Sequence, residues 1–225
     1  MLTNFVYPAS KTALLILDMQ RYFTESHHAF ARVAASFVEG GTERYFSHVE
    51  QDVIPNIQSL LSKFRQSAWP ILYTKFGSYL LDGADMPSWA RRLNDYGRTE
   101  FGAPMFPPFE ELNSRIDDRI KPQPNEQVLR KTTSGAVASS SLEQNLRARG
   151  ITHVIVTGVV TAFCVSQTAR ELADRDFDVA IVSDACASFT EVGHSAALTA
   201  FSGAYGWVLS TEQIFQAFMV NETSQ

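Results

Sequence analysis

Short apolar runs of strand length alternate along this chain with amphipathic stretches of helix length. The apolar runs predict strands at residues 12–17, 70–74, 127–131, 153–157, 178–182 and 207–209. The stretches between them predict helices at 49–66, 140–148, 192–202 and 211–218, and another that ends near Arg175. Strands that alternate with helices form βαβ units. We therefore predict a Rossmann-like α/β domain with three layers (α/β/α) and a five- or six-stranded parallel sheet.

Two long segments interrupt this alternation, at about residues 24–48 and 77–124. Both are rich in aromatic residues, and the second also carries many Pro and Gly residues. Connections of this length inside a compact domain are usually lids or binding loops. We predict one hydrolase domain over residues 1–225, in which the two segments either cover the site or form contacts between subunits.

Composition narrows the classes of partner. The chain has 225 residues, 45% of them hydrophobic, and a net charge of −5. Because lysines and arginines form no cluster, we expect no nucleic-acid partner. No apolar run approaches the roughly 20 residues of a membrane span, and the first residues do not resemble a signal peptide, so we expect a cytoplasmic protein without a membrane partner. Of the two cysteines, Cys164 and Cys186, we expect both to be free thiols.

Three reactive residue types lie where predicted strands end. Asp18 follows the strand at 12–17, Lys131 ends the strand at 127–131, and Cys164 lies in the turn after the strand at 153–157. In open α/β sheets the ligand binds beyond the carboxyl ends of the strands, so these side chains are expected to converge. Thr161 is a candidate N-cap that would place Cys164 in the first turn of a helix, where free backbone amides favour the thiolate.

Each of these residues also has an ordinary structural interpretation. A cysteine in an apolar βα unit is more often a small core residue than a nucleophile. An Asp after a strand often caps the next segment, and a Lys at a strand end is often solvated. Taken together, the three residues favour a nucleophile, Cys164, with a proton acceptor, Asp18, and a cation, Lys131.

Longer motifs around these residues add a family resemblance. The segments LLILDMQRYF (14–23), LRKTTSGAV (129–137) and VIVTGVVTAFCV (154–165, continuing to 188) resemble the isochorismatase-like cysteine hydrolase superfamily. The resemblance implies a catalytic triad of Cys164, Asp18 and Lys131. It further implies an oxyanion hole formed by the backbone amides of Val160 and Cys164, and a cis peptide bond at 159–160. Gly158 would relieve crowding before that turn.

Departures from the family pattern bear on metal binding. Nicotinamidases of this superfamily carry an Asp-x-His pair and a second His after the second strand. Here the corresponding segment, KFGSYLLDGADMPSW, contains no histidine. We therefore predict an enzyme with no metal and no other cofactor. His27, His28 and His48 match no ligand spacing known to us and are expected to line or cover the pocket, whereas His194 is expected to support the site indirectly or to contact a second subunit.

The resemblance also suggests a substrate class. Gln20, Phe23, Thr161 and Phe163 are expected to contact a small-molecule substrate, although both phenylalanines also fit a plain core role. The KTTSGAV segment is closer to the amidohydrolase branch, which favours cleavage of a C–N bond in a small amide, ureide or carbamoyl compound. The alternatives are isochorismatase-type hydrolysis of a vinyl ether and a non-catalytic binding protein on the same scaffold. Relatives commonly form homodimers or homotetramers, and we expect the same here.

Overall fold

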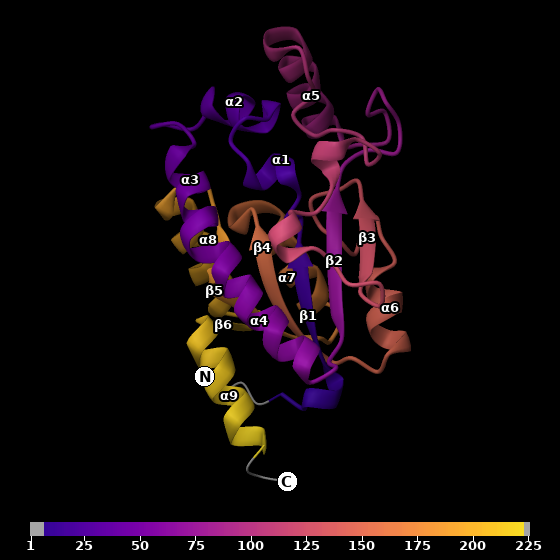
Figure 1. Cartoon of the computed structure of the whole chain (residues 1–225), viewed down its shortest axis with the longest axis vertical. Coiled ribbons are helices and arrows are strands. Elements are labelled where there is room, and N and C mark those ends of the chain that lie inside the picture. The colour runs from indigo at the N-terminus through magenta and orange to yellow at the C-terminus, as the bar shows by residue number, and fades with distance from the viewer. Residues whose placement is uncertain (1–6, 223–225) are drawn as a thin grey trace.

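A parallel β-sheet forms the centre of the computed structural model, which describes residues 7–222. Within that range the sheet has six strands in the order β3-β2-β1-β4-β5-β6 (Figure 1). All neighbouring strands pair in parallel. This confirms the predicted fold class and is the strand order of a Rossmann-like sheet. The strands are β1 (Thr12–Leu17), β2 (Ile71–Phe76), β3 (Gln127–Lys131), β4 (His153–Val159), β5 (Asp178–Ala187) and β6 (Trp207–Leu209).

Helices cover both faces of the sheet, as alternate side chains of the central strand show. Leu14 and Ile16 of β1 belong to one buried cluster, and Leu15 and Leu17 belong to another. The first cluster includes residues of α4 (Ile54–Gln66) and α9 (Thr211–Glu222). The second includes residues of three further helices: α6 (Leu142–Ala148), α7 (Ser166–Ala173) and α8 (Glu191–Ser202). Because both faces are buried, β1 is apolar at nearly every position.

The helix predicted at 49–66 is the C-terminal part of a longer helical segment. α3 (Glu43–His48) continues through a π-helical turn, η2 (Val49–Val53), into α4. Pro55 follows directly after this turn and has no N–H to donate within the continuous helix, so the helical hydrogen-bond pattern is interrupted there. Gly150, with φ +66°, follows α6 and ends it. Within residues 7–222, no helix is both long and apolar enough to cross a membrane.

The two long segments are partly helical and gather beyond the carboxyl ends of the strands (Figure 1). The short α1 (Arg21–Thr24) leads from β1 into the first segment, which contains α2 (Ala29–Ala35) and α3. The second segment contains α5 (Ser88–Phe101), which packs against α2. It also contains two single 3-10 turns, η3 (Leu112–Ser114) and η4 (Asp118–Ile120). Both segments therefore lie at the edge of the sheet where the ligand is expected.

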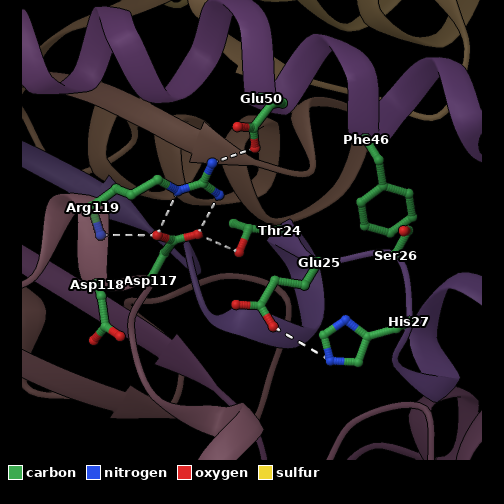
Figure 2. Close-up of a pocket in the computed structure, with 9 residues that line it drawn as sticks. All are labelled: Thr24, Glu25, Ser26, His27, Phe46, Glu50, Asp117, Asp118 and Arg119. Atoms are coloured by element: carbon green, nitrogen blue, oxygen red, sulfur yellow. Dashed lines mark hydrogen bonds and ion pairs between the residues drawn. The ribbon is translucent and has the colours of Figure 1, made fainter.

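An ionic network fastens the two long segments to each other (Figure 2). The Arg119 guanidinium donates to both carboxylate oxygens of Asp117, at 2.9 and 2.7 Å, and pairs with Glu50 of η2. The Thr24 hydroxyl at the end of α1 donates to the same carboxylate at 2.7 Å. Burial by itself would raise the pKa of Asp117, but the hydrogen bonds from Arg119 and Thr24 hold it below its ordinary value. The network therefore fixes α1 relative to residues 77–124.

Gly158 allows β4 to pass close to β1. Its φ is +107°, a region that side-chain-bearing residues rarely occupy. A Cβ atom at this position would lie 2.1 Å from the Leu17 carbonyl oxygen. This confirms the expectation that a glycine relieves crowding just before the turn.

We expect Gly158→Ala to lower the free energy of unfolding by at least about 2 kcal/mol, because both the backbone dihedral and the contact with β1 become strained. Urea unfolding followed by circular dichroism measures the change. Gly203→Ala is the matched control, because Gly203 has φ −70° and an added Cβ would meet its nearest neighbour at an ordinary 3.5 Å. Equal effects of the two substitutions would contradict this account.

Candidate active site

The three strand-end residues predicted to converge do meet in the structure. The Lys131 Nζ lies 2.7 Å from Asp18 Oδ2 and 3.3 Å from Cys164 Sγ. Asp18 directly follows β1, and Cys164 lies in the turn after β4. These two strands are neighbours at the point where the strand order reverses, which is where Rossmann-like sheets open a crevice.

Lys131 is fully buried, and polar groups satisfy its ammonium. In addition to the carboxylate and the sulfur, Nζ donates to the backbone carbonyls of Thr133 at 3.0 Å and Ser134 at 2.9 Å. The ring of Phe76 lies under it, with the centroid 4.6 Å away. Burial alone would lower the pKa of Lys131, but Asp18 and the neighbouring sulfur raise it above its ordinary value. The side chain is therefore an ammonium at neutral pH.

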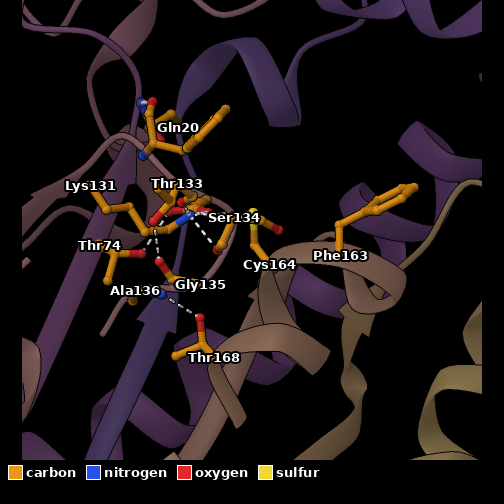
Figure 3. Close-up of polar contacts among 12 residues, drawn as sticks. Gln20, Thr74, Lys131, Thr133, Ser134, Gly135, Ala136, Phe163, Cys164 and Thr168 are labelled. Atoms are coloured by element: carbon orange, nitrogen blue, oxygen red, sulfur yellow. Dashed lines mark hydrogen bonds and ion pairs between the residues drawn. The ribbon is translucent and has the colours of Figure 1, made fainter. Parts of the chain in front are cut away.

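The loop after β3, which supplies those carbonyls, is anchored on α7 (Figure 3). The backbone N–H of Ala136 donates to the Thr168 hydroxyl at 3.0 Å, and that of Val137 donates to the Glu171 carboxylate at 2.9 Å. At Gly135, a Cβ atom would lie only 2.2 Å from the same carboxylate. The small residues of the KTTSGAV segment therefore let the loop approach α7 closely and hold its carbonyls toward the ammonium.

The two carboxylate oxygens of Asp18 have different partners. The Thr74 hydroxyl donates to Oδ1 at 2.6 Å. Oδ2 is buried and forms an ion pair with the Lys131 ammonium at 2.7 Å. A φ of +55° places Asp18 in the left-handed region, where short polar residues are best tolerated. Asp18 is therefore held by Thr74 on one side and by the Lys131 ammonium on the other.

Cys164 is buried, and the thiol is its resting form. Burial raises the pKa of the thiol to about 12; the Lys131 ammonium opposes this shift, and Asp18 adds to it. The sequence-based expectation of a thiolate stabilised by the helix start is therefore wrong, because desolvation outweighs the nearby positive charge. The proposed N-cap is also wrong: Thr161 is the first residue of a π-helical turn, η5 (Thr161–Val165), and Val160 is its N-cap.

The turn before the nucleophile has the geometry implied by the resemblance. The Val159–Val160 peptide bond is cis. Val160 and Cys164 both line the cavity described next. Their amides as an oxyanion hole remain a prediction, because no bound carbonyl oxygen defines the hole.

A cavity of about 510 Å³ opens above Cys164. Phe23 and Phe163, the predicted substrate contacts, line it together with Phe76, Phe189 and Ser134. The aromatic long segments supply much of the remaining wall: Phe30, Phe37, Trp89, Leu93, Met105 and Phe106. The side chains of Phe37 and Phe163 are about half exposed, at 53% and 52%, and therefore mark the mouth of the cavity.

Gln20 and Thr161 were expected to contact substrate, but neither lines the cavity. The Gln20 amide is buried and exchanges hydrogen bonds with the backbone of Phe76, at 2.9 and 2.7 Å, and donates to the Ser114 hydroxyl at 3.1 Å. The Thr161 hydroxyl faces His194 Nδ1 at 3.0 Å. Both side chains are thus hydrogen-bonded to other parts of the fold and lie outside the cavity lining, which does not favour their predicted role as substrate contacts.

Sequence reasoning missed Ser134 as a lining residue. Its hydroxyl lies 3.8 Å from Cys164 Sγ, facing the sulfur (Figure 3). The signal was available, because Ser134 stands in the KTTSGAV segment. The lining residues of α5 carried no such signal, since aromatic content indicates a buried or binding segment without saying which face is turned to the site.

The histidines lie away from the cavity. None of His27, His28 and His48 lines it, and whether they cover it stays a prediction. The side chains of Glu25, His27 and His28 lie close enough to share a metal ion, with their ligand atoms within 4.8 Å of one another. His27 is largely exposed and lines a separate surface pocket, drawn in Figure 2, together with Asp117 and Arg119. His194 contacts Thr161, and its role as an indirect support or a subunit contact stays a prediction.

Cys186 plays no part in this site. It is fully buried in β5, and its sulfur contacts the Val156 carbonyl at 4.0 Å. Both cysteines are free, as predicted. The cavity therefore has a single thiol on its wall, that of Cys164.

Comparison with known proteins identifies the family. The family model described as an isochorismatase domain matches residues 12–213. An uncharacterized isochorismatase family protein of Bacillus subtilis is 25% identical over 93% of this chain and 97% of its own length. Ureidoacrylate amidohydrolase of Variovorax paradoxus is 26% identical over 93% of this chain and 82% of its own length.

Solved structures share the fold. A cysteine hydrolase from Pseudomonas syringae pv. phaseolicola superposes with a TM-score of 0.78 at 21% identity, with 96% of each chain covered. N-carbamoylsarcosine amidase from Thermoplasma acidophilum superposes with a TM-score of 0.63 at 20% identity, covering 89% of this chain and 96% of that one. With the family model matching nearly the whole chain, this protein belongs to the isochorismatase family of hydrolases.

Proposed function

We propose that this protein hydrolyses the C–N bond of a small amide, ureide or carbamoyl compound through a Cys164 thioacyl-enzyme. The observation that carries the proposal is the buried cluster of Asp18, Lys131 and Cys164 at the wall of a cavity large enough for a small molecule. The names of the relatives support the reaction class, since a ureidoacrylate amidohydrolase and a nicotinamidase are among them.

The first half-reaction is acylation of the thiol. The Cys164 sulfur attacks the carbonyl carbon while its proton passes to the carboxylate of Asp18, the neighbouring base. Because the pKa of the thiol is about 12, loss of the proton must accompany attack rather than precede it. Asp18 then returns the proton to the departing nitrogen, which leaves as ammonia or an amine.

The second half-reaction releases the acid. Water attacks the thioester carbonyl, gives a proton to Asp18, and the C–S bond breaks. The proton returns to the sulfur and regenerates the thiol. The Lys131 ammonium stays protonated throughout and stabilises the negative charge that moves between the carboxylate and the sulfur. The amides of Val160 and Cys164 are the proposed donors to the carbonyl oxygen.

The reaction is proposed to need no metal ion. Residues 75–89, which begin within β2 and extend beyond it, contain no histidine. Protonation of the leaving nitrogen and stabilisation of the oxyanion are both assigned to groups of the chain itself. We also propose that the protein forms a homodimer or homotetramer.

Replacing the nucleophile tests the mechanism. We expect Cys164→Ser and Cys164→Ala to lower kcat for amide hydrolysis at least about 1,000-fold, because no other thiol lines the cavity. Ammonia release measures the rate, and circular dichroism checks that the fold survives. Cys186→Ser removes the other cysteine and is expected to retain activity. Undiminished hydrolysis by the Cys164 variants would refute a thioacyl-enzyme.

The role of Asp18 has a separate signature. Asp18→Asn is expected to abolish turnover and yet shift the pH profile of Cys164 alkylation by iodoacetamide to lower pH. The carboxylate raises the pKa of the thiol, and its removal leaves the Lys131 ammonium as the nearest charge. In the unsubstituted protein the alkylation rate should rise steadily above pH 8, because the thiol has a pKa of about 12.

Thr74→Val serves as the control for that experiment, because it removes the hydrogen bond to Asp18 Oδ1 and retains the carboxylate. Its alkylation profile should stay close to that of the unsubstituted protein. An Asp18→Asn variant with reduced alkylation throughout the pH range would rule out this electrostatic role.

The subunit number is checked by light scattering at micromolar concentration. We expect the mass of a dimer or a tetramer of the 225-residue chain. A monomer over the whole concentration range would contradict that part of the proposal.

A further inference from the structure

We infer that the preferred substrate is an uncharged amide that carries an aromatic group, and that amides bearing a carboxylate are rejected. This inference rests on the proposed amide hydrolysis and specifies its substrate class. Three observations carry it: the chemistry of the cavity wall, the engagement of the nearest cation, and the position of the polar groups at one end of the cavity.

The wall of the Cys164 cavity is apolar and rich in aromatic rings. Phenylalanines come from several separate parts of the chain, among them Phe23 after β1, Phe106 in the second long segment and Phe189 after β5. Trp89 of α5 stacks on Phe76, with ring centroids 5.9 Å apart and an interplanar angle of 3°. Such walls favour an aromatic guest, which can meet the surrounding rings edge-to-face or in offset stacks.

No described residue with a charged side chain lines this cavity. A carboxylate placed inside would lose its hydration without gaining a counterion, which is strongly unfavourable. The nearest cation, Lys131, is fully buried behind the wall and is already engaged by Asp18 and two backbone carbonyls. It therefore has no donor to spare for a substrate carboxylate.

The polar lining groups lie together at the reacting end. Among the lining residues that the structure describes, Ser134 is the one with a hydroxyl, and it lies 3.8 Å from the Cys164 sulfur. An amide group can therefore place its carbonyl at the sulfur and Val160 and its nitrogen near the serine hydroxyl. The rest of the molecule then has only apolar surface to contact, as far as the rim formed by Phe37 and Phe163.

A matched pair of probes separates charge from size. 2-(4-Nitrophenyl)acetamide and 2-(4-carboxyphenyl)acetamide have planar ring substituents of nearly the same shape, and only the second is ionised at pH 7. We expect kcat/KM for ammonia release to be at least about 100-fold higher for the nitro compound. Binding of the two compounds to the Cys164→Ala protein, measured by calorimetry, should show the same order without requiring turnover.

A cation introduced into the cavity wall should weaken the preference for the nitro compound over the carboxylate compound. Leu93→Lys on α5 adds an ammonium to the cavity wall and is expected to narrow the ratio of the two kcat/KM values at least about 10-fold. Tyr96→Lys is the matched control, because it adds the same charge to the same helix at a position outside the cavity lining. It should leave the ratio unchanged.

The outcomes distinguish this inference from the proposed function. Tighter binding of the nitro compound without turnover would uphold the substrate class and refute amide hydrolysis. Turnover that favours the carboxylate compound, or is equal for both, would uphold hydrolysis and overturn the substrate class. Failure of the neutral probe to bind or react would also overturn it, as would equal narrowing of the ratio by Leu93→Lys and Tyr96→Lys.

Discussion

The Lys131 ammonium, buried without contact with solvent, is the interaction on which the rest of the site depends. An isolated cation in such a place would lose its proton, but here Asp18, the Cys164 sulfur and two carbonyls of the loop after β3 surround it. Each partner comes from a different part of the chain. The cation therefore joins the ends of β1 and β3 to the turn after β4 and holds the proposed nucleophile and base around one charge. Loss of the cation would leave the buried Asp18 carboxylate without a counterion. The geometry of the site therefore depends on its charge balance.

The same burial bears on the proposed proton transfer. In the apolar cavity the thiol of Cys164 keeps its proton, with a pKa of about 12, and the negative charge resides on Asp18. The helix start and the nearby ammonium do not overcome desolvation. A protonated thiol beside a carboxylate is suited to the proposed proton transfer during attack, when the substrate supplies an electrophile. Dry, aromatic walls thus control both the protonation state of the nucleophile and the proposed choice of an uncharged guest.

The long segments complete the site from outside the sheet. Arg119 and Asp117 fasten residues 77–124 to the end of α1, next to Phe23. α2 packs against α5, and both contribute cavity residues. These segments are rich in aromatic residues because their rings both pack against one another and line the cavity. A sheet alone would place the triad at an open edge accessible to water.

The sequence by itself determined the sheet, the order of its elements and the three polar strand ends. Hydrophobic periodicity is a local property of the sequence. Because buried parallel strands are apolar on both faces, β1 and β4 can be predicted from their residues alone. The motifs around Asp18, Lys131 and Cys164 likewise indicated the family. Tertiary structure alone decided the protonation of the thiol, the scaffold roles of Gln20 and Thr161, and which aromatic rings form the wall. Those properties depend on desolvation and on contacts between residues far apart in the chain, which local pattern does not encode.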